Sequence, residues 1–282
     1  MVYIGDCGNY YIDNKANKMQ NRRKISVSAI VTGYNEGYIL EDCLKSISFC
    51  ENIKYVDQGS NDNSIEIAKQ YSNEIIEHER VPLGEAIVAE YYKSEKNDWI
   101  LIIDPDERIS FELYKDIIAL FEKGIPDNIG AILVPCIYYY KKHLLKGTRW
   151  GGIHSRMLLF HKDRCKMTGV VHAGRTVLPP YEPFWIAYNG KNIDHHYWMI
   201  SFSQLREKHL RYLKMEAESR NLMGFVASRK GILKRPFRAF YSCYFKMKGY
   251  KDGLYGLLLS FFWAWYDTCA EIRLYKYQKQ QK

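Results

Sequence analysis

Short apolar runs alternate with helix-like patterns along the first half of the chain. Residues 25–31 form a β-rich apolar run, and Trp99–Ile103 is apolar throughout. Between such runs, apolar residues recur every three to four positions, as from Ile39 to Ile47, which is the spacing of one helical face. Strands that are apolar along their length and alternate with helices of about 10–15 residues are typical of a parallel α/β sheet.

The pattern predicts an order of elements as far as residue 223. Strands are expected at residues 25–31, 53–56, 74–77, 99–103, 129–140 and 156–160, and helices at 39–47, 65–71, 84–95, 110–121 and 201–223. Ser110 suits the N-cap of the fourth helix, and residues 169–180 are expected to be loop. The resulting division is a polar lead-in at 1–24, an α/β domain at 25–200 and a helical region at 201–282.

Polar clusters follow three of the predicted strands. They are Thr32–Glu36, Asp57–Asp62 and Asp104–Glu107. In parallel α/β sheets, ligands bind outside the carboxyl ends of the strands. We therefore expect the three clusters to gather at one edge of the sheet and to form a site there.

Bulk composition indicates a folded protein of ordinary character. Of 282 residues, 47% are hydrophobic and 26% are charged, with a formal net charge of +9. The seven cysteines are dispersed without metal-finger spacing, as expected for reduced thiols. The first 24 residues lack the apolar core of a secretory signal. These features predict a cytoplasmic protein.

The C-terminal region changes character at Ser228. Eight basic residues and no acidic one lie between Ser228 and Lys251, interleaved with aromatic residues. An apolar run at residues 254–266 follows, too short for the roughly 20 residues that span a bilayer. Residues 228–266 are predicted to lie on an anionic membrane, giving peripheral attachment to its inner face. The alternative is a helical subdomain with a solvated basic face; nucleic-acid binding is disfavoured because no known module is present.

The tripeptide Asp104-Pro105-Asp106 carries the clearest candidate chemistry. Two carboxylates at a strand exit are costly to bury unless they are paired or bound to a ligand. Carboxylate oxygen is what Mg²⁺ or Mn²⁺ prefers, with positions left for phosphate. The alternative is an acidic turn that caps the next helix. Asp57 could likewise bind a ligand or form a turn. Glu36 could bind a ligand or interact favourably with the dipole of the helix that follows it.

Three ordered motifs resemble one enzyme family. They are S-A-I-V-T-G-Y-N-E from Ser28, K-Y-V-D-Q-G-S-N-D-N-S from Lys54 and D-W-I-L-I-I-D-P-D-E-R from Asp98. Together they resemble the N-terminal half of family 2 inverting glycosyltransferases, closest to small bacterial enzymes that decorate lipopolysaccharide and other surface glycans. Lys248–Ser260 resembles the tail of the same group. The resemblance implies a GT-A fold, with a Rossmann-like, mostly parallel sheet flanked by helices, and a basic, aromatic helical appendage.

The resemblance also implies roles for individual residues. The nucleotide pocket would be lined by Thr32, Tyr34, Asn35 and Glu36, with Asp57 holding the base and Asp104 the ribose. Asp106 would bind the Mn²⁺ or Mg²⁺ that bridges the diphosphate. The donor would be a nucleotide sugar, UDP-linked, and the acceptor a hydroxyl of a lipid-linked or cell-surface glycan.

One departure concerns the catalytic base. The resembling enzymes follow Val-His with Glu, whereas Ala173 follows His172 here. His172, Glu182 and Asp194 are the candidate bases. One of His172, His195 and His196 could supply a further metal ligand, and His195 is the predicted one. Adjacent His195 and His196 point to opposite faces of an extended strand, so at most one of the two should reach the metal. Position alone suggests that Arg149, Trp150 and Arg156 belong to the acceptor side.

Two other functions remain open at this point. Ala173 is compatible with a catalytically weakened protein that binds sugar nucleotides or glycans as a scaffold. A sugar nucleotidyltransferase can share the sheet architecture, but it would require a glycine-rich, Arg-containing phosphate loop after the first strand. Residues 32–36 do not form such a loop.

Overall fold

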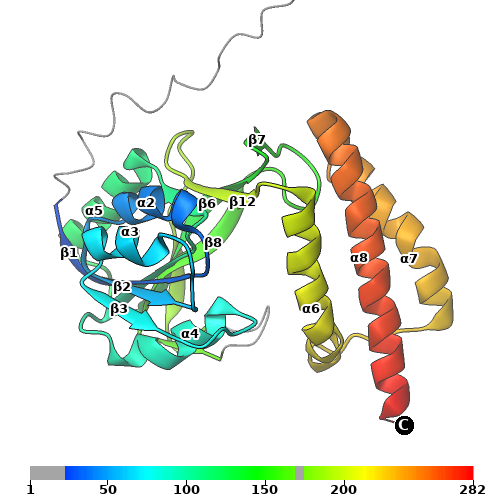
Figure 1. Cartoon of the computed structure of the whole chain (residues 1–282), viewed down its shortest axis with the longest axis horizontal. Coiled ribbons are helices and arrows are strands. Elements are labelled where there is room, and N and C mark those ends of the chain that lie inside the picture. Colours follow the sequence, from blue (N-terminus) through cyan, green and yellow to red (C-terminus); the bar gives the residue numbers. More distant parts are fainter. Residues whose placement is uncertain (1–22, 169–174, 282) are drawn as a thin grey trace, which may run out of the picture.

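Residues 23–168 and 175–281 are described by a computed structural model of the chain. A sheet flanked by helices forms the first part, and three long helices stand beside it (Figure 1). The strands are β1 (Ile25–Gly33), β2 (Cys50–Asp57), β3 (Glu74–Glu77), β4 (Trp99–Ile103), β5 (Glu107–Ile109), β6 (Ile129–Tyr140), β7 (His143–Leu144), β8 (His154–His161), β9 (Cys165–Met167), β10 (Arg175–Val177), β11 (Glu182–Trp185) and β12 (Asp194–Met199). The α-helices are α2 (Gly37–Ser46), α3 (Ser64–Tyr71), α4 (Gly84–Tyr91), α5 (Phe111–Lys123), α6 (Phe202–Leu222), α7 (Arg229–Tyr241) and α8 (Gly253–Gln280).

The central sheet has the strand order β3-β2-β1-β4-β8-β6-β12-β5, with β7 and β11 also paired to β6. β1, β2, β3 and β4 are mutually parallel. β8 runs antiparallel between β4 and β6, and β12 returns parallel to β6. The predicted α/β fold with a mostly parallel sheet is therefore confirmed, with an antiparallel strand at its centre.

Two apolar layers cover the sheet. Successive strand residues point to opposite faces, so Val27 and Val31 of β1 pack with Leu113 of α5, and in the same cluster with α2 and α3. Ile30 packs on the other face with Val88 of α4. Because β1 is covered on both faces, its continuous apolar sequence is explained, and its polar carboxyl end is left at the sheet edge.

Several short elements differ from the sequence prediction. β5 follows Asp106 immediately, although residues 104–107 were expected only to end a strand. β10 pairs with β9 inside the expected loop at 169–180. The helix predicted at 84–95 is α-helical only to Tyr91 and ends in a 3₁₀ turn at Tyr92–Ser94. Strands of three residues are too short to show an alternating pattern, which is why they escape prediction.

The three C-terminal helices form a layer of their own. Helix α8 lies between α6 and α7 (Figure 1), and the predicted helix at 201–223 corresponds to α6. The apolar run at 254–266 belongs to the 28-residue α8. Within the described ranges, no helix combines the length and the apolar character needed to cross a membrane.

A buried ion-pair network fastens these three helices together. Arg220 of α6 contacts Glu216 at 2.8 Å and Asp267 of α8 at 2.9 Å. Arg235 of α7 contacts the other Asp267 oxygen at 2.7 Å and Glu271 at 3.2 Å. Removing one partner of such a network leaves a buried charge uncompensated, which costs about 3–5 kcal/mol. The relative position of α6, α7 and α8 is thus fixed by specific charge pairs.

Candidate functional site

The loops after β1 and β2 are bonded to each other at the carboxyl edge of the sheet. β1 and β2 stay in register to their last residues, Gly33 and Asp57. Beyond them, the backbone N–H of Asn35 donates to Ser60 Oγ at 2.9 Å, and that of Asn61 donates to Asn35 Oδ1 at 2.8 Å. Asn35 has a φ of 54°, a left-handed conformation that Asn tolerates better than most residues. The predicted convergence of these strand ends is confirmed.

Asp104-Pro105-Asp106 forms the tight turn from β4 into β5. The N–H of Glu107 donates to the Asp104 carbonyl at 2.9 Å, and the N–H of Asp104 donates to Glu107 Oε2 at 2.8 Å. The N-cap of α5 is Ser110, whose Oγ accepts from Leu113 N at 3.1 Å. Since Ser110 already caps the helix, capping does not explain the two aspartates.

His196 of β12 lies against the carboxylate of Asp106. Its Nε2 is 3.3 Å from Asp106 Oδ2, and its Nδ1 is 3.2 Å from Glu107 Oε1. Both ring nitrogens are buried, and neither contact has hydrogen-bond geometry within the described protein. Burial disfavours the charged form of Asp106, but His196, Lys208 and Arg156 together outweigh burial and lower the pKa of Asp106 to about 2. Asp106 is therefore a carboxylate at neutral pH.

Arg156 of β8 supports this turn from beneath. Its guanidinium contacts Glu107 and lies 2.7 Å from Asp194 Oδ2, and it donates to the Ile102 carbonyl at 2.9 Å. The neighbouring carboxylates outweigh burial and raise the pKa of Arg156 above its ordinary value. Arg156, which position had assigned to the acceptor side, instead holds β4, β5 and β12 together.

A cleft of about 910 Å³ opens above the turn. Six residues of its wall were predicted from the first and third strand ends: Thr32, Tyr34, Asn35, Glu36, Asp104 and Asp106. The Arg80 guanidinium lies 3.7 Å from the centre of the Tyr34 ring, as in a stacked cation–π pair. Basic side chains from the rest of the chain complete the wall: Arg80, Arg175, Lys208, Arg211, Lys214 and Arg273.

The family model of glycosyl transferase family 2 matches residues 28–177, which is more than half of the chain and includes all three converging strand ends. The chain belongs to glycosyl transferase family 2. The sequence resemblance is thereby confirmed. The matched part ends at β10, so α6, α7 and α8 lie beyond it.

Two solved structures illustrate the similarity. TarS 1–349 of S. aureus in complex with UDP-GlcNAc shares 11% identity over 92% of this chain and 93% of that one, with a TM-score of 0.44. Glucosyl-3-phosphoglycerate synthase of Mycobacterium tuberculosis, with Mn²⁺, UDP and glucosyl-3-phosphoglycerate, shares 17% identity over 44% of this chain, with a TM-score of 0.32. The alignment spans 46% of the length of that synthase.

Lys208 is a site residue of this family 2 chain that the sequence did not single out. It comes from α6 and lines the cleft together with Asp104 and Glu36. Burial opposes its charge, but Tyr212, Asp106 and Asp104 raise the pKa of Lys208 above its ordinary value. Burial and Asp106 also raise the pKa of Glu36, to about 8. No local signal could have identified Lys208, because α6 reads as an ordinary charged helix.

Asp57 is placed differently from the residues of the cleft wall. Its Oδ2 accepts from the N–H groups of Gly59 at 3.0 Å and Ser60 at 2.8 Å, so the carboxylate closes its own turn. It is 1% exposed, and among the described residues Gln58 lines the cleft in its stead. The turn-forming interpretation of Asp57 fits this geometry, and contact with the base stays a prediction.

The candidate bases are spread over the molecule. Glu182 pairs with Ile129 at the start of β6, whereas His196 pairs with Tyr138 nine residues further on, or about 30 Å along the strand. Asp194 is fully buried against Arg156. Neither location suits a base that meets an acceptor. His172 lies outside the described residues.

The metal-ligand prediction for His195 does not fit the strand's orientation. His195 points to the opposite face of β12 from His196, and its Nδ1 lies 3.0 Å from the Tyr139 hydroxyl. His196 is the histidine that the structure brings to Asp106. Because adjacent residues of a strand point to opposite faces, only one of the two histidines faces the site. The sequence alone does not determine which histidine that is.

Proposed function

We propose that the chain transfers a sugar from a UDP-linked donor to a hydroxyl of a lipid-linked or cell-surface glycan, with inversion and a divalent cation. The observation that carries this proposal is the cleft at the ends of β1 and β4, with Asp104 and Asp106 at its floor and a basic wall around it. Cations complement the diphosphate, and the stacked pair of Tyr34 and Arg80 offers a planar surface to the base.

Asp106 and His196 are suited to hold the cation. A carboxylate oxygen and a buried imidazole nitrogen without a hydrogen-bond partner lie together, which fits Mn²⁺ or Mg²⁺. Within the described ranges, no group of three or more His, Cys, Asp and Glu side chains could hold a metal. The diphosphate and water would therefore complete the shell, as is usual for such ions. The cation supplies charge neutralisation for the departing diphosphate.

The chain's own residues act on the same leaving group. The bond from the anomeric carbon to the diphosphate oxygen breaks as the acceptor hydroxyl attacks from the opposite face and gives up its proton to a general base. Lys208, which stays protonated between Asp104 and Asp106, provides a fixed positive charge where negative charge develops. Arg156 keeps the turn that carries both aspartates in place.

Release of UDP tests this function directly. We would measure it from a panel of UDP-sugars with cell-envelope extract as acceptor, with Mn²⁺, Mg²⁺ or EDTA present. Asp106→Asn should abolish turnover, and His196→Ala should raise the Mn²⁺ concentration needed for half-maximal rate. His195→Ala is the matched control and should leave that concentration unchanged. Tight UDP-sugar binding without turnover would instead indicate a scaffold, and pyrophosphate exchange with UTP would indicate a nucleotidyltransferase.

We also propose that α7 and α8 rest on an anionic membrane. Exposed apolar side chains recur along α7 and the turn after it, Leu233, Phe237, Tyr241 and Phe245, at 51–77% exposure. A second stripe on α8 comprises Leu254, Leu258, Phe261 and Trp265. Phe240 joins the stripes, because its ring centre lies 4.6 Å from that of Phe261. Exposed lysines and arginines flank them, which favours anionic lipid over a second, equally basic copy of the chain.

Vesicle flotation tests the membrane contact. The full chain should float with phosphatidylcholine vesicles that contain phosphatidylglycerol and much less with pure phosphatidylcholine. Leu233→Ser/Phe237→Ser should weaken partitioning by about tenfold or more. Trp185→Ser, at an exposed apolar position on β11, is the control. Undiminished flotation of the double variant, or a dimer that this variant dissociates, would contradict the proposal.

A further inference from the structure

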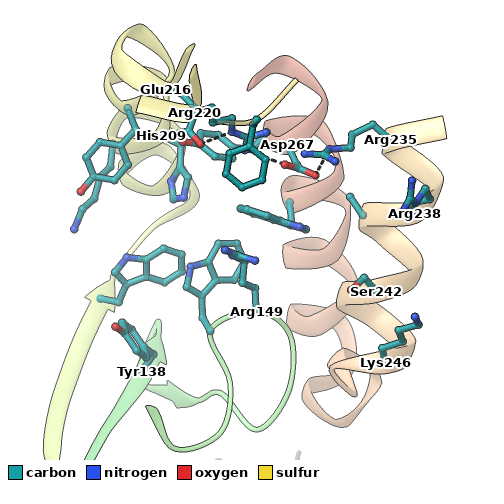
Figure 2. Close-up of a pocket in the computed structure, with 18 of the residues that line it drawn as sticks. Tyr138, Arg149, His209, Glu216, Arg220, Arg235, Arg238, Ser242, Lys246 and Asp267 are labelled. Carbon is teal, nitrogen blue, oxygen red and sulfur yellow. Dashed lines mark hydrogen bonds and ion pairs between the residues drawn. The ribbon is translucent and has the colours of Figure 1, made fainter. Parts of the chain in front are cut away.

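A second cavity adjoins the donor cleft. Its volume is about 930 Å³, and it lies between the ends of β6 and β12 and the helices α6, α7 and α8 (Figure 2). Asp104, Lys208 and Tyr212 line both the cavity and the cleft. The two spaces therefore meet at the aspartate turn, where the sugar of a bound donor would lie. A molecule in the second cavity would have access to that sugar.

Aromatic side chains form the inner wall of this cavity. Trp150 lies 4.7 Å from Trp198 and 5.9 Å from Trp263, measured between ring centres. Tyr138 lies edge-on to Trp198 at 6.3 Å. Flat aromatic faces with a few polar groups suit sugar rings, which have apolar C–H faces and polar edges. The prediction that Trp150 belongs to the acceptor side agrees with this placement.

Helix α7 presents a polar row to the cavity. Arg235 and Arg238 of α7 are followed by Ser242 and Lys246 of the π-helical turn that continues it, at the spacing of one helical face (Figure 2). The apolar stripe that starts at Leu233 follows a different line on the same helix. A polar row that lines the cavity and an exposed apolar stripe thus lie next to each other on α7.

The cavity is lined by more cationic side chains than carboxylates. Six cations line it, Arg149, Lys208, Arg220, Arg235, Arg238 and Lys246, against three carboxylates, Asp104, Glu216 and Asp267. Arg220 and Arg235 are engaged by carboxylates of the helix network. Within residues 23–168 and 175–281, Arg149, Arg238 and Lys246 have no carboxylate partner, and Arg149 lies over the Trp263 ring at 4.2 Å. These three cations are available to an anion.

Arg220 adds a buried hydrogen-bond donor to these unpaired cations. It is 8% exposed, and its Nη1 has no hydrogen-bond partner in the described part of the chain. The nearest carboxylate oxygen, Glu271 Oε2, is 4.0 Å away, beyond hydrogen-bond distance. Buried donors of this kind are usually satisfied, so an acceptor oxygen from a ligand would complete it.

We propose that this second cavity is the acceptor site and that it selects a glycan bearing an anionic group, a phosphate or a carboxylate, next to the sugar that is extended. The aromatic wall holds the sugar rings, and Arg149, Arg238 and Lys246 hold the anion. The inference rests on the proposed glycosyl transfer. It also explains why the polar row and the apolar stripe share α7: an acceptor anchored in the membrane reaches the cavity from the side on which the helix meets lipid.

Simple sugars of matched shape test the selectivity. Three of the six tryptophans line the cavity, so intrinsic fluorescence reports occupancy. The full chain would be titrated with glucose, glucose 6-phosphate and glucuronate, each with and without saturating UDP and Mn²⁺, which keep phosphate out of the donor cleft. At least one charged sugar should bind about tenfold more tightly than glucose. Preference for the phosphate or for the carboxylate identifies which anion the acceptor carries.

Two double variants locate the binding. Arg238→Gln/Lys246→Gln changes exposed residues only, and it should bring the charged sugars to the affinity of glucose while UDP affinity is unchanged. Lys69→Gln/Lys123→Gln removes the same charge from the other side of the molecule and should leave the preference intact. Equal binding of all three sugars to the wild type, or retained preference in the first variant, would overturn the inference. If UDP fails to bind, the proposed function fails separately, because the titrations without UDP still report on the cavity.

Discussion

His209 of α6 is held neutral in an aromatic enclosure. It is 6% exposed, and its Nδ1–H donates to the Leu205 carbonyl at 2.8 Å. Five rings meet it edge-on with centres 4.9–6.1 Å away, those of Trp150, Trp198, Tyr212, Phe262 and Tyr266. Burial lowers the pKa of His209 to about 4. We expect this residue to make the protein sensitive to mild acid.

The sign and size of the pH effect of His209 on the free energy of unfolding follow from proton linkage. In the unfolded chain, a histidine has a pKa of about 6.5, so between about pH 6.5 and 4 the unfolded state binds a proton that the folded state does not. Stability therefore falls as pH falls through that window. With these two pKa values, His209 costs about 2 kcal/mol at pH 5 relative to pH 7, and about 3 kcal/mol below pH 4.

Urea unfolding at pH 7 and pH 5 measures this contribution. From pH 7 to pH 5, the free energy of unfolding of His209→Leu should fall by about 2 kcal/mol less than that of the wild type. This difference does not depend on how stable the variant is at pH 7. His78→Gln is the control of opposite sign, because the hydrogen bond to the Glu79 carbonyl raises the pKa of His78, so its removal should not reduce acid sensitivity. If the free energy of unfolding of the wild type and of His209→Leu changed in parallel with pH, His209 would not be the source of the acid sensitivity.

Three further substitutions probe the same framework. Arg156→Met leaves the buried carboxylates of Glu107 and Asp194 unpaired. Unfolding in urea should show a free energy of unfolding lower by about 3–5 kcal/mol. An unchanged urea midpoint would contradict the role assigned to Arg156. Gly256→Ala places a methyl group against the carbonyl oxygen of Gly249, which is backbone and cannot move aside, so thermal unfolding should show a loss of at least about 1–3 kcal/mol. Lys208→Met should reduce kcat by about a hundredfold with a smaller change in KM, and a pure KM effect in steady-state kinetics would show that its charge acts only in donor binding.

The parts of the site that the sequence predicts are those encoded locally. Residues 25–31 and 99–103 are apolar because both faces of the sheet are covered, so their ends could be located from pattern alone. Asp104 and Asp106 follow directly from that placement. The turn role of Asp57 was also open to prediction, since Asp before Gln-Gly-Ser is a common turn sequence.

The parts that escaped prediction depend on contacts distant in the chain. Whether His195 or His196 faces Asp106 is decided by the register of β12 against β5 and β6, which no property of residues 194–199 specifies. Arg156 reads as one charge in an apolar strand until Glu107 and Asp194 are placed on either side of it.

The aspartate turn lies within the part of the chain that the family model matches, and the helices that line the second cavity lie beyond it. Everything that positions the aspartate turn, apart from β12, lies within residues 28–177. Lys208 and Tyr212, which line both the donor cleft and the second cavity, come from α6, beyond that match. The network around Arg220 fixes α6 to α7 and α8, so the helices that form the second cavity also hold Lys208 in place. A change to this ion-pair network is therefore coupled to donor chemistry through α6, whereas Arg238 and Lys246 do not take part in it. Variants of the network need donor binding measured alongside acceptor binding.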